Sequence, residues 1–260
     1  MLFIFPDILL CQWYGESAYR FGVNSRTPSS LEIAQTDVIG AIVKPYTLGG
    51  YAFSTGYTFR PDSLNVAFST GVSYLKSHSG NFLFTSWPYY PAYMSIKHDL
   101  ISADLGLSFE FKIKKINSST GIVLMLPVYM KGMEIQPATT WNLNEIRRGI
   151  YYGWGPGIRI HQDFSLWNRG RTAFFAGVSA GWISAWRKSR NLLTGDPSVP
   201  ASKREIHYLT DRQISEKGKI NDPSLSGFDP KLPIETATYN EPLSFVALKM
   251  GLTFYLQKKN

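Results

Sequence analysis

The chain has 260 residues and a formal net charge of +8; 18% of its residues are charged and 15% are aromatic. Its single cysteine, Cys11, excludes an internal disulfide and a metal site built from cysteines. No run of 18 apolar residues occurs, which argues against a membrane-spanning helix. Many basic residues gather at 187–219 without an interleaved aromatic platform, so we predict no nucleic-acid partner.

The N-terminal segment is interpreted as a degenerate or truncated signal. Residues 1–10 are mostly apolar, but Pro6 and Asp7 interrupt them and no basic residue precedes Arg20. A secretory signal combines a basic start with a continuous apolar stretch. We therefore assign 1–15 to such a segment and 16–260 to one domain. Lipidation at Cys11, which follows two leucines, is the weaker alternative.

Alternation of apolar and polar residues is the clearest pattern in the chain. From Ile101 to Ile113 every second residue is apolar, and the same period returns from Val246 to Leu256. A period of two is typical of a β-strand with one apolar face. We predict eight strands, at about 16–25, 48–60, 64–76, 93–113, 121–131, 149–164, 172–186 and 244–257.

The connections between these strands alternate in length. Those after the second, fourth and sixth strands are short, whereas the others are long, at about 26–47, 77–92, 132–148 and 187–243. Bacterial outer-membrane barrels have this layout, with short periplasmic turns and long external loops. We interpret 187–243 as an external loop that could carry a small extra hairpin. A further strand at 37–44 would raise the strand count to ten.

The polar faces of the predicted strands carry charges of both signs. A Lys or Arg facing lipid near the bilayer midplane costs about 2–4 kcal/mol. We therefore expect the charges to face the interior, where they can pair, and the apolar faces to contact lipid. In 121–131 both faces are apolar, and we place Ile122, Leu124, Leu126, Val128 and Met130 outward. The expected interior charge cluster is Arg20, Asp104, Glu110, Lys112, Arg159, His161 and Lys249.

The predicted strands are long for a soluble sheet but suit a tilted crossing of a bilayer, which needs about 9–11 residues. The predicted fold class is therefore all-β. It is a closed, antiparallel, up-and-down transmembrane β-barrel of eight strands, with ten strands as the alternative.

The last strand resembles the C-terminal assembly signal of outer-membrane barrels in its sequence KMGLTFYL at 249–256. The matching positions are Lys249, Gly251, Phe254 and Leu256. The segments 64–74, 103–112 and 149–164 resemble the small eight-stranded outer-membrane barrel families of the Bacteroidetes type, described as PorT-like and OmpA-like. The resemblance implies that the barrel-assembly machinery is a partner, and it implies no catalytic residues.

Residues at the outer ends of two neighbouring predicted strands could supply a serine nucleophile and a histidine base, as a lipid A-modifying barrel enzyme requires. They are Ser77, His78, Ser79, His98 and Asp99. His78 adjoins both serines and therefore points away from them, so we predict no catalytic site. His207 has no ligand partner at metal-binding spacing, and the glycines at 153–157 lack the context of a phosphate loop. We expect no cofactor or metal.

The sequence thus predicts a non-enzymatic integral protein of the bacterial outer membrane, surrounded by lipid and with a filled interior. Its long loops would serve a structural role or bind an envelope or surface partner. A small-solute channel, a lipid-modifying enzyme and a soluble lipocalin-like binder are the alternatives.

Overall fold

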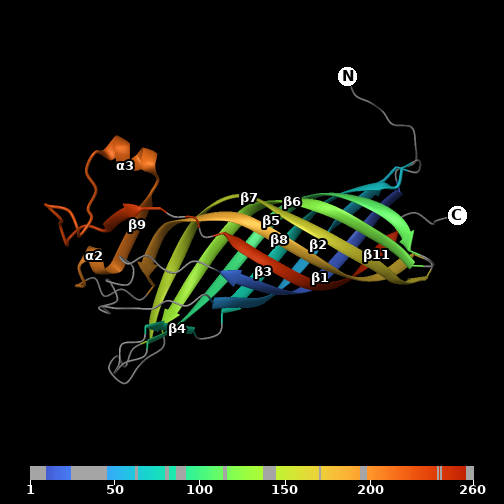
Figure 1. The fold of residues 1–260 in the computed structure, drawn as a ribbon, viewed down its shortest axis with the longest axis horizontal. Coiled ribbons are helices and arrows are strands. Elements are labelled where there is room, and N and C mark those ends of the chain that lie inside the picture. The colour runs from blue at the N-terminus through green and yellow to red at the C-terminus, as the bar shows by residue number, and fades with distance from the viewer. Residues whose placement is uncertain are drawn as a thin grey trace.

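A computed structural model of the chain describes residues 10–24, 46–61, 64–79, 82–85, 92–113, 116–136, 145–169, 171–193, 198–238, 240 and 242–255. Eight long strands form its body, which is elongated (Figure 1). Their bounds are β1 (Leu10–Asn24), β2 (Tyr46–Arg60), β3 (Val66–Ser79), β5 (Ala92–Ile113), β6 (Ile116–Gln136), β7 (Ile146–Arg169), β8 (Thr172–Leu192) and β11 (Leu243–Tyr255).

These eight strands pair in a ring. Each is antiparallel to the next along the chain, and β11 pairs with both β8 and β1. The all-β, up-and-down antiparallel fold with eight strands agrees with the alternation in the sequence. The strand considered at 37–44 lies outside the described residues.

The two ends of the ring differ. The short connections, 61–65, 114–115 and 170–171, join strands at the end where β1 begins and β11 ends, on the right in Figure 1. The opposite end carries a short strand, β4 (Phe82–Thr85), which pairs with β5. It also carries residues 198–238, which we call the cap. The predicted alternation of short and long connections is therefore confirmed.

The cap contains α2 (Ala201–Arg204), β9 (Glu205–Leu209), α3 (Asp211–Lys217) and β10 (Ile234–Ala237). β9 extends the sheet by pairing with β8, and β10 pairs with β9 in parallel. Within 187–243, the end of β8 and β9 form an antiparallel pair at 189–191 and 205–207, as a small extra hairpin would. The β9–β10 pair is parallel and therefore needs a crossover, and α3 lies in that connection. No helix among the described residues is long and apolar enough to cross a bilayer.

Outward and inward positions follow the predicted parity. Leu105, Val246 and Leu248 lie on the outer face, where 50%, 58% and 60% of their surfaces are exposed. Asp104, Arg159 and Lys249 face the interior and are at most 5% exposed. Because successive strand residues point to opposite faces, the apolar band and the charged interior arise from the same alternation.

One predicted orientation, that of Met130, is wrong. Met130 is buried in the interior, whereas Ile122, Leu124, Leu126 and Val128 face outward as expected. β5 pairs with Pro127 and then with Tyr129, so Val128 is an extra residue in β6. This β-bulge reverses the parity beyond it. Pro127 has no N–H to donate to a neighbouring strand, which explains why the ladder is interrupted here.

Candidate functional site

A chain of ion pairs crosses the interior of the ring. Arg159 on β7 lies 3.4 Å from Glu16 on β1 and 3.4 Å from Asp104 on β5. Lys249 on β11 joins Glu16 to Asp163 on β7, at 2.9 Å from each carboxylate. Three carboxylates and two cations therefore link strands from different sides of the ring. A buried network of this kind is stable only when its members are paired.

Small neighbouring residues make room for the network. Asp104 accepts a hydrogen bond from Ser102 at 2.7 Å and another from Ser73. Gly177 on β8 pairs with Asp163 on β7, and a Cβ atom at position 177 would lie 2.2 Å from Asp163 Oδ1. Glycine at this position therefore leaves the space that the carboxylate occupies.

A second charged group lies near the cap end of the interior. Glu134 on β6 is 3% exposed and accepts hydrogen bonds from Arg148 at 3.1 Å and Arg190 at 2.8 Å. Arg187 is also buried. Buried apolar residues on β5, β6, β7 and β8 separate this group from the central network. They belong to a cluster that includes Leu100, Met125, Met130, Ile150 and Ile183.

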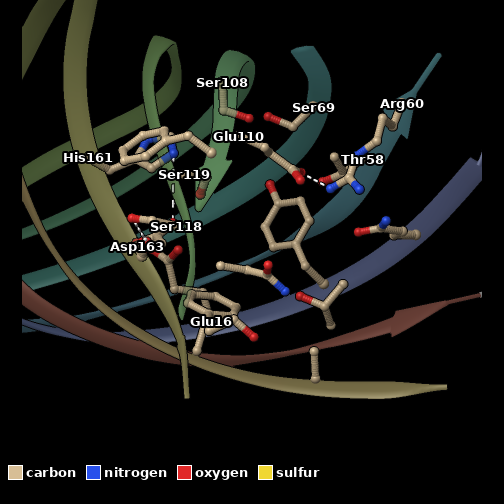
Figure 2. A pocket seen from close by; sticks show the side chains of 18 of the residues that line it. Glu16, Thr58, Arg60, Ser69, Ser108, Glu110, Ser118, Ser119, His161 and Asp163 are labelled. Carbon is tan, nitrogen blue, oxygen red and sulfur yellow. Dashed lines mark hydrogen bonds and ion pairs between the residues drawn. The ribbon is translucent and has the colours of Figure 1, made fainter. Parts of the chain in front are cut away.

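On the other side of the network, a polar cavity of about 520 Å³ extends to the end of the ring with the short connections. We call it the vestibule. Arg60 and Glu110 form an ion pair on one side of it, and His161 and Asp163 lie on the other side (Figure 2). Its wall also carries hydroxyl and amide side chains, among them Thr58, Asn65, Ser69, Ser108, Asn117, Ser118 and Ser119.

Several buried polar atoms on the vestibule wall have no hydrogen-bond partner within the described part of the chain. They are Gln12 Nε2, Arg159 Nε, His161 Nδ1 and Asp163 Oδ1. A buried polar group without a partner costs roughly 1–3 kcal/mol. The vestibule is therefore a place for water or a small polar molecule.

The structure brings together only some of the predicted interior charges. Asp104, Arg159, His161 and Lys249 lie in or beside the central network. Glu110 lies nearer the mouth, paired with Arg60. Lys112 lines the vestibule at its exposed rim, so it faces the cavity as predicted but lies away from the central network. It lies at the end of β5, where the ring opens to solvent. The side chain of Arg20 lies outside the described residues.

Besides Arg60 at the mouth of the vestibule, six charged residues of the interior were not predicted from the sequence. They are Glu16, Glu134, Arg148, Asp163, Arg187 and Arg190. Glu16 lies four residues before Arg20 and therefore on the same face of the strand, so its inward orientation could have been predicted. Asp163 lies in the predicted strand 149–164 with the same parity as Arg159 and His161, so it too could have been predicted. The remaining four lie at 132–148 and 187–243, which we expected to be connections because the apolar alternation fades there.

The assembly-signal positions lie on both faces of β11. Lys249 and Gly251 face the interior, and Phe254 faces outward, with its ring 5.2 Å from that of Trp13 on β1. Leu256 lies outside the described residues. The structure does not test recognition by assembly machinery.

The candidate enzymatic residues are divided between the two faces. Ser77 Oγ lies 3.5 Å from His98 Nδ1, and His98 Nε2 lies 2.9 Å from the Tyr152 hydroxyl. His98 is completely buried, whereas His78 is exposed on the outer face. Asp99 also faces outward and accepts a hydrogen bond from Tyr74 at 2.8 Å, so it does not orient His98. Ser77, His98 and Tyr152 form a buried hydrogen-bonded group.

The molecule belongs to the class of all-β proteins in which a ring of eight antiparallel strands encloses a charged interior and exposes an apolar outer band. Within the described residues, no three His, Cys, Asp or Glu side chains are placed to hold a metal ion. No protein-family model matches the chain, and no curated protein matches it.

A pair of cysteine substitutions tests whether the vestibule opens at one end only. In a Cys11→Ser background, we expect Ser108→Cys to react with a small charged thiol reagent more than about tenfold faster than Ser102→Cys. Both residues face inward on β5, but Ser108 lines the vestibule, whereas Ser102 is 1% exposed beside the network. Reaction rates are measured by mass spectrometry. Equal rates at the two positions would mean that water and reagent pass the network freely.

Proposed function

We propose that the chain is an integral β-barrel protein of the bacterial outer membrane, non-enzymatic, with a filled interior and an external cap that serves a structural or partner-binding role. The observation that carries the proposal is the outer face of the ring. On β5, outward-facing Leu105 and Phe109 are half-exposed, and on β11 the same holds for Val246, Leu248 and Met250. Exposed apolar surface that continues around a molecule is typical of contact with lipid or a partner.

The interior supports the same proposal and disfavours the alternatives. A soluble lipocalin-like barrel has an apolar interior and a polar outside, which is the reverse of what Asp104 and Leu105 show. A solute channel needs an aqueous path, but Arg159 bridges Glu16 and Asp104, and buried Met125 and Ile183 lie in the apolar cluster beyond. A lipid-modifying enzyme needs an accessible nucleophile, and the buried Ser77–His98 pair does not offer one.

The cap is the part that a partner outside the membrane would meet. It lies at the end of the long connections, which is the external end in outer-membrane barrels. The parallel pair β9 and β10 has its own small core of Ile206, Tyr208 and Ile234, against which Phe228 packs. This core holds the exposed α3 and the surrounding turns in a defined shape, as a binding surface requires.

The test is fractionation followed by gel electrophoresis with and without heating. We expect the full chain to stay with washed membranes, to need detergent for extraction, and to migrate differently before and after boiling in SDS. The physical reason is that a closed ring of hydrogen-bonded strands has no free edge at which SDS can begin unfolding it. A chain that stays in solution without detergent and shows one unchanged band would overturn the proposal.

A further inference from the structure

Three lysines lie together on the outer wall of neighbouring strands, just beyond the apolar band on the cap side. They are Lys76 on β3, Lys97 on β5 and Lys131 on β6, which we call the lysine cluster. Each is partly exposed, and the residues before and after each one in the chain are buried. Alternation along a strand therefore directs all three side chains away from the interior.

The strand register brings the three lysines close to one another. Asp99 on β5 pairs with Lys76 on one side and with Lys131 on the other, and Lys97 lies two residues from Asp99. With strands about 4.8 Å apart, the backbones of Lys76 and Lys131 are separated by about 10 Å. Long, flexible lysine side chains can span that separation, so the three ammonium groups can converge on one anionic group.

The positive charge of the cluster is only partly balanced. Asp99 is the acidic residue between the lysines, and it already accepts a hydrogen bond from Tyr74 at 2.8 Å. Within the described part of the chain, Lys76 and Lys97 form no ion pair. Lys131 lies over the ring of Tyr151, 5.8 Å from its centroid. Three cations against one carboxylate leave a local charge that favours an anion with several oxygens.

The position of the cluster indicates where that anion comes from. Lys76, Asp99 and Lys131 form one row of paired residues across β3, β5 and β6. Two residues along each strand towards the short connections, the outward residues are Tyr74, Ile101 and Tyr129, which form the first row of the apolar band. Tyrosine at such a boundary is typical of a membrane interface. If the ring spans the outer membrane as proposed above, the lysine cluster lies at the level of the outer-leaflet headgroups.

The cluster is confined to one side of the ring. On β2 the residue that pairs with Lys76 is Tyr51, and on β7 the residue that pairs with Lys131 is Tyr151. Aromatic residues therefore flank the three lysines on both sides. A general attraction to a charged membrane surface does not require such a local arrangement, whereas a site for one lipid headgroup does.

We propose that the lysine cluster binds the phosphate groups of an outer-leaflet lipid headgroup. This inference rests on the proposed function. Lysine is a strong phosphate ligand that acts as a point charge, and three of them can contact different oxygens of one or two phosphate groups. Tyr74 and Tyr129, which lie on the short-connection side of the cluster, would contact the region where the headgroup meets the acyl chains.

The test uses the full chain in phosphatidylcholine nanodiscs that contain a minor fraction of diphosphorylated lipid A or of the same glycolipid without phosphate. Native mass spectrometry counts the glycolipid molecules that stay bound. The test variant is Lys76→Gln/Lys97→Gln/Lys131→Gln. The matched control, Lys203→Gln/Lys219→Gln/Lys231→Gln, removes the same charge from three exposed lysines of the cap.

We expect the wild type and the control to retain the diphosphorylated lipid and to release the phosphate-free one. The test variant should bind the diphosphorylated lipid about tenfold or more weakly, because each basic residue near a membrane surface contributes to the attraction. Equal retention by the test variant, or equal retention of both glycolipids, would overturn the inference. Displacement of the lipid by millimolar inorganic phosphate would also overturn it, since the site would then be one for free phosphate.

Failure of this inference can be told apart from failure of the proposed function. A protein that enters nanodiscs and shows heat-modifiable migration, but has no preference for the phosphorylated lipid, contradicts only the lysine cluster. A protein that neither enters nanodiscs nor shifts on gels contradicts both.

Discussion

Replacing Arg159 by methionine is expected to lower the free energy of unfolding by about 3–5 kcal/mol, the usual consequence of removing one partner from a buried ion pair. Arg159 is 4% exposed and contacts both Glu16 and Asp104 at 3.4 Å. Without it, Asp104 keeps only neutral hydrogen-bond donors, and Glu16 keeps only Lys249. The measurement is denaturant unfolding of the folded protein in detergent micelles, with linear extrapolation to zero denaturant.

Two further variants make this result specific. Arg171→Met, at an exposed arginine beside a short connection, should change stability by less than about 0.5 kcal/mol. The triple variant Glu16→Gln/Asp104→Asn/Arg159→Met should recover much of the loss, because only the Lys249–Asp163 pair then remains charged. If Arg159→Met alone cost less than about 1 kcal/mol, the interior charges would be hydrated and the interior would not be filled as described.

The eight strands and the orientation of their side chains could be predicted because an apolar outer face requires an apolar residue at every second position of a strand. Within the band, alternation placed Asp104 inward and Leu105 outward without any structure. The short connections were also predictable, since Pro61 and its neighbours form a compact turn signal.

The ends of several strands could not be predicted from the alternation of apolar and polar residues. β6 and β8 continue to Gln136 and Leu192, beyond the ends expected from alternation. Past the apolar band the outward residues become polar, as at Lys97 and Lys131. With polar residues on both faces, the period of two disappears from the sequence even though the strand continues. This is why Glu134 and Arg190 were assigned to loops.

The start of β1 was missed for a related reason. β1 begins at Leu10, and Gln12 to Gly15 pair with both β2 and β11. In this stretch Trp13 and Tyr14 are adjacent aromatics, so no alternation marks the strand. Its place in the ring is fixed by pairing with two distant segments, which a single sequence does not reveal. The reversal of side-chain orientation beyond Val128 could have been expected from Pro127, which has no N–H to donate to a neighbouring strand.

Replacing Leu105 by arginine is the sharpest test of what surrounds the ring. Leu105 lies near the middle of the outward apolar run on β5 and is 50% exposed. In a bilayer, arginine near the midplane of a barrel costs about 2–4 kcal/mol. In water, the same change at a half-exposed leucine should alter stability by less than about 0.5 kcal/mol. The measurement is the free energy of unfolding of protein refolded into phosphatidylcholine vesicles.

The matched control is Leu232→Arg, because Leu232 lies on the cap and is 52% exposed, nearly the same fraction as Leu105. We expect this variant to be within about 0.5 kcal/mol of the wild type. Met250→Arg on β11, at 56% exposure on the same outer band, should behave like Leu105→Arg. The exposed fractions of the three side chains are similar. A large difference in the free energy of unfolding between the cap variant and the two variants on the outer band would therefore come from the medium around each position. If all three arginine variants were equally tolerated, water or a protein partner, and not lipid, would surround the ring.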